Sequence, residues 1–216
     1  MADAPEVEHI DLGRGSWVDV ARGLLPDAPR VHDDLADGVA WQQGRVFRYE
    51  RWIDEPRLSG WQAGDGRHPA LAAVEDWISR RYRVRFDGVA LARYRHASDS
   101  VAFHRDREMR WLEETVIGVL SLGATRPWLL KPMGADRYAV ADDHAGAGAD
   151  VIDLRPAGGD LLVMGGRCQA NWLHAVPKVQ GGSAVADRIS AQWRWTSRRG
   201  RPDTNPSYRA ARRYGG

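Results

Sequence analysis

The chain has 216 residues, of which 43% are hydrophobic and 28% charged, a balance typical of a globular protein and not of a disordered or fibrous one. Its 31 basic and 29 acidic residues leave a net charge of +2, so the chain as a whole does not attract polyanions. Apolar runs are far shorter than the roughly 20 residues of a membrane helix, and the acidic amino terminus lacks the apolar core of a signal peptide. We therefore expect a cytoplasmic protein, monomeric and without a membrane partner.

Residues 1–82 contain one clear helix. Residues 1–40 are expected to form an irregular amino-terminal extension, and residues 41–53 a half-buried strand, because apolar and polar residues alternate there in places. Residues 54–66 are rich in turn formers and predict a loop. Residues 69–82 begin with a proline and repeat apolar side chains every three or four positions, so they predict an amphipathic helix.

Short strand-like runs separated by Gly, Pro and Asp follow this helix. They span 89–95, 101–106, 115–122, 127–131, 160–164, 171–176 and 188–196, with a further short strand expected at 150–154. A helix followed by many short strands predicts a mainly β fold with flanking helices, in the form of a sandwich, a barrel or a jelly roll. We expect one such domain over residues 41–197.

Residues 198–216 form a tail of different composition. The tail holds six arginines and one acidic residue, Asp203. A segment of this charge can bind a polyanion such as nucleic acid, or it can remain a solvated end. Both interpretations stay open at the level of sequence.

Histidine and carboxylate side chains are the expected ligands if the protein binds a metal. The single cysteine, Cys168, excludes an internal disulfide and a multi-thiolate zinc or iron–sulfur centre. The pattern His-x-Asp begins at His9, His32 and His104, and only the last lies in an alternating, strand-like run. Residues i and i+2 of a strand point to the same face, so His104 and Asp106 are expected to lie side by side.

A third ligand must come from a later strand. His174 lies in the β-prone run 171–176, whereas His144 lies in a loop rich in Gly, Ala and Asp, so we favour His174. Two histidines and one carboxylate on one face of an octahedron form the facial triad of non-haem Fe(II) oxygenases, which leaves positions open for substrate and O2. A single histidine, taken alone, is more often a structural or surface residue than a metal ligand.

The last predicted strand has two chemically different faces. Arg188, Ser190, Gln192 and Arg194 share one face, and the intervening residues of the other face are apolar. Guanidinium groups bind carboxylates through two hydrogen bonds and stay charged when partly desolvated. The pattern indicates a carboxylate-binding site, the alternative being an exposed face with surface arginines.

Taken in chain order, these features resemble the AlkB-type Fe(II)/2-oxoglutarate-dependent dioxygenases, and among them the enzymes that repair alkylated nucleic acids. The resemblance covers about residues 45–196. It is carried by Ala92-Arg-Tyr94, His104-Arg-Asp106-Arg-Glu108, Ser121-Leu-Gly123, Gly159-Asp160-Leu-Leu-Val-Met164, Trp172-Leu-His174-Ala-Val-Pro177 and the pair Arg188 and Arg194.

The resemblance implies a double-stranded β-helix, or jelly roll, in which His104, Asp106 and His174 bind Fe(II) and O2 is consumed. Arg188 and Arg194 would bind the carboxylates of the co-substrate 2-oxoglutarate.

A hydrogen bond from Tyr94 would assist in binding this co-substrate. The chain departs from the family pattern at two amides: the family's Asn-x-Tyr reads Ala92-Arg-Tyr94, and its Arg-x-Asn reads Arg188-Ile-Ser190. Ser190 therefore offers a hydroxyl where an amide is usual.

The substrate implied by the resemblance is an alkylated base of DNA or RNA, flipped from a duplex or taken from a single strand. Glu108 matches an acid near the polar edge of such a base, Trp61 an aromatic lid residue, and Arg57 is available to a phosphate. Two alternatives stay open: an oxygenase acting on a protein or small molecule, and a catalytically silent nucleic-acid-binding jelly roll. A zinc hydrolase could use the same ligands but gives the two arginines no role.

Overall fold

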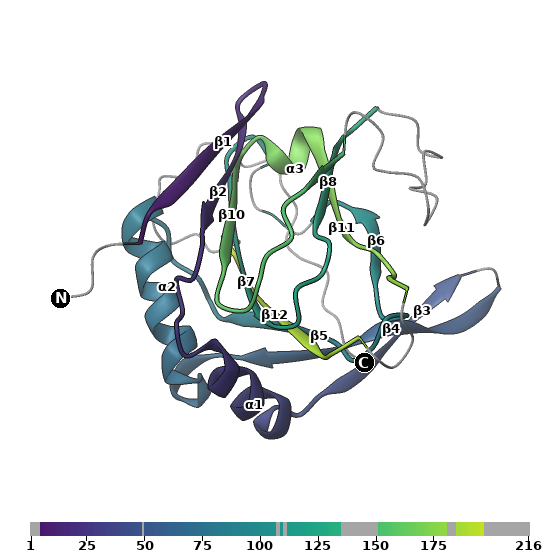
Figure 1. Cartoon of the computed structure of the whole chain (residues 1–216). Helices are drawn as coiled ribbons and strands as arrows, with labels where there is room; N and C mark the ends of the chain where they lie inside the picture. The colour runs from purple at the N-terminus through teal and green to yellow at the C-terminus, as the bar shows by residue number, and fades with distance from the viewer. Residues whose placement is uncertain are drawn as a thin grey trace.

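The computed structural model describes residues 5–48, 50–106, 109, 112–134, 151–180 and 185–196. Its strands form two antiparallel sheets that face each other (Figure 1). In the described residues the larger sheet has eight strands in the order β1-β2-β10-β7-β12-β5-β4-β3, and the smaller has four in the order β6-β11-β8-β9. This arrangement confirms the predicted mainly β, jelly-roll architecture.

The strands of the larger sheet are β1 (Val7–Gly13), β2 (Ser16–Ala21), β3 (Gln42–Arg48), β4 (Arg51–Gln62), β5 (Val89–Tyr94), β7 (Thr115–Gly123), β10 (Leu161–Gly166) and β12 (Arg188–Arg194). Those of the smaller sheet are β6 (Val101–His104), β8 (Leu129–Pro132), β9 (Ile152–Asp153) and β11 (Trp172–Val176). The helical segments are α1 (Ala28–Gly38), α2 (Pro69–Tyr82), the four-residue α3 (Cys168–Asn171) and a 3-10 turn (Gly64–Gly66).

Helix α2 forms over the predicted range, 69–82. Pro69 occupies the first turn, where its missing N–H costs nothing, and the ring of His68 accepts a hydrogen bond from the N–H of Ala70 at 3.2 Å. The helix ends at Arg83, whose left-handed backbone (φ 55°) stops the hydrogen-bonding pattern. Its buried apolar stripe packs on the outer face of the larger sheet.

The larger sheet separates two apolar cores. On β12, Ile189 and Trp193 face outward and pack with Leu71 and Ile78 of α2, together with residues of α1. Residues of the opposite face, such as Tyr94 of β5, lie in a second core between the two sheets. Residues that alternate along β12 and β5 therefore point either to the helices or into the jelly roll.

The amino-terminal region differs from the prediction. Residues expected to be irregular form β1, β2 and α1, and β2 pairs with β10 from Leu161↔Ala21 to Gly166↔Ser16. Val31 of α1 is buried in the outer core, so packing shows no break at residue 40. The side chains of β1 are mostly exposed, because it is an edge strand, and for this reason they carry no apolar periodicity.

The predicted loop at 54–66 is also wrong over most of its length, since β4 continues to Gln62 and pairs with β5. Gly60, which contributed to the turn signal, lies inside this strand. A Cβ at Gly60 would lie 2.6 Å from a methyl group of Val39, so the glycine permits the close approach of a neighbouring segment.

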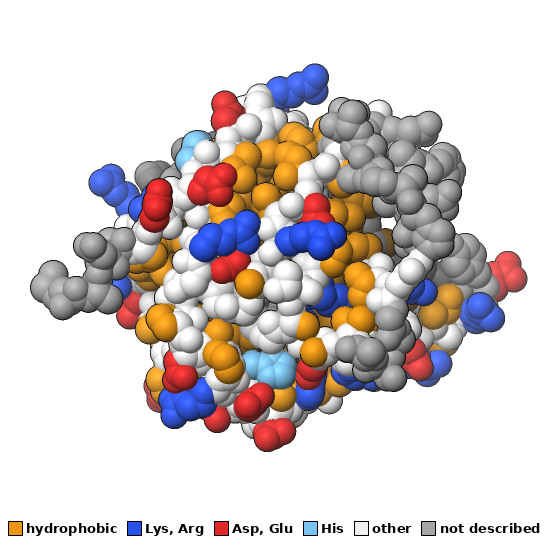
Figure 2. Space-filling view, viewed as in Figure 1, with side chains coloured by type: hydrophobic (Ala, Val, Ile, Leu, Met, Phe, Trp, Pro, Cys, Tyr) orange, Lys and Arg blue, Asp and Glu red, His pale blue; other side chains and the backbone are white. Residues whose placement is uncertain are grey.

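Acidic and basic side chains are interspersed on the face seen in Figure 2, in keeping with the net charge of +2. No helix among the described residues is both long and apolar enough to cross a membrane. The basic tail 198–216 and Glu108 lie outside the described residues.

Candidate metal centre and co-substrate pocket

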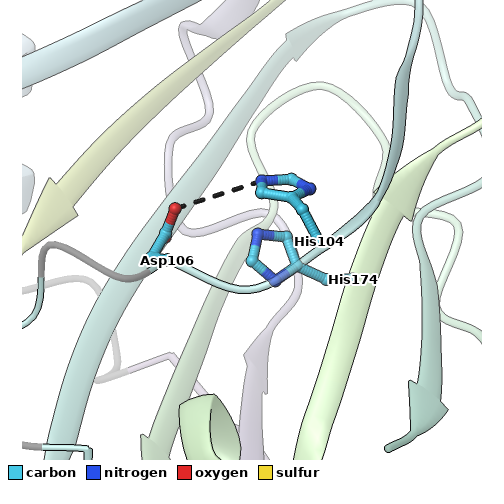
Figure 3. A group of neighbouring side chains, drawn as sticks. All are labelled: His104, Asp106 and His174. Atoms are coloured by element: carbon cyan, nitrogen blue, oxygen red, sulfur yellow. Dashed lines mark ion pairs between the residues drawn. The ribbon is translucent and has the colours of Figure 1, made fainter.

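The three predicted metal ligands lie together and point toward one another (Figure 3). His104 ends β6, Asp106 follows two residues later, and His174 belongs to β11, which pairs with β6 so that His174 lies opposite His104. The ring centroids of the two histidines are 4.2 Å apart. One ligand atom from each of the three side chains lies within 4.8 Å of the other two, a spacing that suits a single metal ion.

The protonation states of these side chains suit a metal. The Nδ1 of His104 donates to the carbonyl of Ala102 at 2.9 Å, which leaves the Nε2 lone pair directed toward Asp106 at 4.0 Å. Burial lowers the pKa of His104. Burial also lowers the pKa of His174, to about 3, and the neighbouring His104 adds a smaller effect in the same direction.

Asp106 remains ionised despite its surroundings. Burial acts to raise the pKa of its carboxyl, but Arg194, and after it His174 and His104, hold that pKa well below its usual range. Neutral imidazoles and an ionised carboxylate are the forms that bind metals, so the site is electrostatically ready for a divalent cation.

Three further side chains contact the ligands. Arg194 donates from Nε to Asp106 Oδ2 at 2.9 Å, and Gln169 of α3 accepts from the backbone N–H of Asp106 at 2.7 Å. The ring of Trp128 stacks on His174 at 5.6 Å between centroids. Gln169 and Trp128 were not anticipated, because neither belongs to a periodic pattern or motif and both reach the site only through tertiary folding.

A group of buried polar side chains, the proposed co-substrate pocket, lies on the inner face of β12 and β5. Arg188 is 0% exposed, pairs in the ladder with Tyr94, and donates from Nη2 to Ser121 Oγ at 2.9 Å. Ser190 is equally buried, and the ladder places it opposite Ala92. The complete burial of Arg188 rules out the alternative of an exposed strand face with surface arginines.

The donors of this pocket fit 2-oxoglutarate. Within the described residues, Arg188 Nε and Nη1 and Ser190 Oγ are buried without a hydrogen-bond partner. Burial lowers the pKa of Arg188 to about 10, so it remains a cation at neutral pH. A buried cation with two unused donors is costly unless an anion accepts from it, and a carboxylate matches its planar fork.

Arg194 takes a different position from Arg188. Its guanidinium binds Asp106 and the side chain of Gln192, so it lies at the metal ligands and not within the buried pocket. A carboxylate near the metal could share this guanidinium with Asp106. The expected pair of arginines therefore lines one face, with Arg188 at one end of β12 and Arg194 at the other.

Two of the predicted substrate residues lie on the same inner face. Arg57 and Trp61 are four residues apart on β4, so their side chains point to the same face of the sheet. Strand pairing places Trp61 opposite Ala90, and Ala90 opposite Gln192, so these three residues form one row across the sheet and share its inner face. The Trp61 side chain is 60% exposed.

Residues 41–53, predicted as one half-buried strand, contribute instead to two paired strands, β3 and the start of β4, which carry two exposed aromatic rings. Phe47 of β3 and Trp52 of β4 are 61% and 60% exposed, and their centroids are 5.6 Å apart in an edge-to-face arrangement. Figure 1 shows the β3–β4 hairpin extending beyond the body of the molecule on the side of β6. Alternation of apolar and polar residues predicts a strand, but it does not show which of its aromatic side chains are buried by packing against another part of the protein.

Comparison with known proteins assigns the family. Residues 23–209 match the model of the 2OG-Fe(II) oxygenase superfamily, whose description names both groups that the site fits. The chain is 28% identical over 177 residues to the alpha-ketoglutarate-dependent dioxygenase alkB homolog 3 of Bos taurus, covering 71% of this chain and 57% of that protein. It is also 28% identical over 210 residues to the DNA oxidative demethylase ALKBH2 of Arabidopsis thaliana, covering 82% and 66%.

These relatives confirm the resemblance to AlkB-type enzymes, and the chain spans 57% and 66% of their lengths. A prolyl hydroxylase from Trichoplax adhaerens, solved with a peptide fragment of hypoxia inducible factor, has the same fold, with a TM-score of 0.57 and 14% identity. That match covers 83% of each chain. The protein belongs to the 2OG-Fe(II) oxygenase superfamily.

Proposed function

We propose that this protein is a dioxygenase that uses Fe(II), 2-oxoglutarate and O2 to remove alkyl groups from damaged bases of DNA or RNA. Two observations together carry the proposal: the His104, Asp106 and His174 cluster, and the buried, incompletely paired guanidinium of Arg188 on the inner face of β12. The relatives named as alkB homolog 3 and DNA oxidative demethylase favour a nucleic-acid base over a protein side chain or a metabolite.

Each group of residues has its own task in this reaction. His104, Asp106 and His174 would hold Fe(II), and Arg188, Ser190 and Tyr94 would bind 2-oxoglutarate. A contact between Arg194, which also binds Asp106, and a carboxylate of the co-substrate stays a prediction. When bound, Fe(II) with this co-substrate and O2 supplies the oxidising power, and 2-oxoglutarate leaves as succinate and CO2. One oxygen atom enters a C–H bond of the alkyl group, and a hydroxylated N-methyl group is lost as formaldehyde, which restores the base. The protein contributes orientation and the exclusion of water.

The surface next to the site suits a flipped or single-stranded base. Exposed rings stack on bases of any sequence, and Trp61, Phe47 and Trp52 are exposed on β3 and β4. Arg57 offers a donor to a phosphate. A contact between Glu108 and the base, and a role for the basic tail, stay predictions.

Release of formaldehyde from a methylated oligonucleotide tests the proposal. Protein supplied with Fe(II), 2-oxoglutarate and O2 is expected to form formaldehyde and succinate in equal amounts from a chemically methylated single strand, and far less formaldehyde from the unmethylated strand. Turnover of a protein or small-molecule panel without formaldehyde from the oligonucleotide would replace this proposal by the first alternative. Metal-independent binding of the oligonucleotide with no consumption of 2-oxoglutarate would favour the silent module.

The oligomeric state and location belong to the same proposal. A cytoplasmic monomer stays a prediction, to be checked by light scattering during gel filtration and by cell fractionation.

A further inference from the structure

The side chain of Gln169 is an amide buried behind the metal ligands. It belongs to the short α3 segment between β10 and β11 and is 1% exposed. Burial of an amide is unfavourable unless its polar atoms find partners. Its oxygen accepts the N–H of Asp106 at 2.7 Å, and its nitrogen lies 3.7 Å from the sulfur of Met164. Because a backbone N–H can only donate, the oxygen is the atom that must face Asp106.

Asp106 needs such a contact because it lies beyond the sheet. Strand β6 ends at His104, and the pairing of β6 with β11 begins at that residue. The backbone of Asp106 is therefore not held by the ladder that positions His104 and His174. Two contacts fix it instead: Gln169 on the backbone N–H, and Arg194 on the carboxylate at 2.9 Å.

The segment that carries Gln169 is itself firmly attached. The thiol of Cys168 donates to the carbonyl of Trp17 at 3.5 Å, and the amide of Asn171 donates to Ser16 Oγ at 3.1 Å. These contacts hold α3 against the β1–β2 hairpin. The chain then continues directly into β11, which carries His174. One short segment thus positions Asp106 through a hydrogen bond and His174 through chain continuity.

We propose that Gln169 is a positioning residue for the metal ligand Asp106, which acts by holding the backbone N–H of that residue. The inference rests on the proposed function, because it assumes that Asp106 binds the metal. Removal of a group that orients a ligand weakens metal binding by roughly 10- to 100-fold. Gln169 is expected to act at this scale, without a comparable effect on the stability of the metal-free fold.

The test compares Gln169→Met with Gln62→Met, a control that removes another glutamine whose oxygen accepts a backbone N–H, that of His68, but that lies on β4 and does not touch Asp106. Mn(II), a redox-stable substitute for Fe(II), is titrated into each full-length protein by calorimetry. We expect at least about a tenfold loss of affinity in Gln169→Met and an unchanged affinity in Gln62→Met. Hydrogen exchange at the Asp106 amide is expected to quicken only in Gln169→Met.

Equal Mn(II) affinities for wild type and Gln169→Met would overturn the proposal, as would unchanged exchange at Asp106. If Gln169→Met does not fold, Gln169→Asn serves in its place, because it keeps an amide that is one methylene too short to reach the N–H. Failure of the wild type to bind Mn(II) would instead contradict the proposed metal site. The exchange measurement on the metal-free protein would still decide whether Gln169 holds Asp106.

Discussion

At the scale of single residues, the site depends on charges that are buried before any ligand arrives. Arg188 is enclosed, yet within the described residues two of its nitrogens have no acceptor. Its one described side-chain hydrogen-bond partner is the Ser121 hydroxyl, and its guanidinium lies over the Tyr94 ring, 5.6 Å from the centroid. An enclosed cation of this kind contributes little to the stability of the empty fold and much to the binding of an anion.

Replacing Arg188 by methionine should separate ligand binding from stability. Loss of a desolvated charge partner costs about 2–5 kcal/mol of binding, so 2-oxoglutarate affinity measured with Mn(II) present should fall by at least about 30-fold. The free energy of unfolding of the unliganded protein in urea should fall by no more than about 1 kcal/mol, the value of one hydrogen bond. Strong destabilisation with unchanged affinity would mean that Arg188 is structural.

Arg194 sets the pH range in which the metal binds. Burial acts to raise the pKa of Asp106, and Arg194 is the largest of the influences that lower it. Besides burial, the charge of Arg194 also lowers the pKa values of His104 and His174. In Arg194→Met the pKa values of all three ligands rise, so protons compete with the metal at a higher pH. The midpoint for loss of Mn(II) binding on acidification should therefore shift upward, measured by titrations between pH 8 and pH 5. An unshifted midpoint would contradict this assignment.

At the scale of elements, one buried arginine joins the ends of several strands. Arg126 lies between β7 and β8 and donates to the carbonyls of Asp99 and Pro177, each at 2.8 Å, and to those of His96 and Ala97. Its guanidinium also lies 5.5 Å from the centre of the Tyr94 ring. Because these partners follow β5 and β11, Arg126 fixes the segments that lead to His104 and away from His174.

Replacing Arg126 by methionine should destabilise the fold strongly. The substitution leaves buried carbonyls unpaired, each at a cost of about 1–3 kcal/mol, so the free energy of unfolding in urea should fall by about 3 kcal/mol or more. Arg45→Met is the matched control, since Arg45 forms an exposed ion pair with Asp54 and should matter by less than about 1 kcal/mol. Equal effects of the two substitutions would refute the role given to Arg126.

At the scale of the whole molecule, the amino-terminal hairpin completes the larger sheet. Strand β2 covers the edge of β10, and Val18 and Val20 contribute to the core between the sheets. The match to the family begins at residue 23, after both strands of the hairpin. The chain therefore extends the sheet beyond the part that the family model describes.

Deletion of residues 1–22 should make the protein aggregate. The deletion exposes the edge of β10 and removes apolar side chains from the inner core, and bare strand edges pair with other chains. The soluble fraction after expression, and light scattering of any refolded material, are expected to show loss of the monodisperse protein. A soluble truncated protein with unchanged Mn(II) affinity would show that the hairpin is dispensable.

The features that were predicted correctly depend on residues close together in the sequence. The helix at 69–82 and the alternating faces of β12 follow from side-chain periodicity. The His-x-Asp spacing identified His104 and Asp106 as neighbours, although the strand predicted to carry both ends at His104. Strand β1 escaped prediction because an exposed edge strand needs no apolar alternation. Strand β2 escaped it because it lies between β1 and β10 and is buried on both faces, so its side chains do not alternate either. Gln169 and Arg126 bind backbone atoms distant in sequence, so no pattern of neighbouring residues points to them.

The most direct test of the account is an anaerobic titration of Fe(II) and 2-oxoglutarate into wild type, His174→Ala and His9→Ala. His9 begins another His-x-Asp pattern but lies on β1, where it contacts Asp19. We predict a single Fe(II) per chain in wild type and in His9→Ala, with a visible charge-transfer absorption only when both ligands are present. His174→Ala should give neither. Wild-type Fe(II) affinity and absorption in His174→Ala would contradict the metal centre described above.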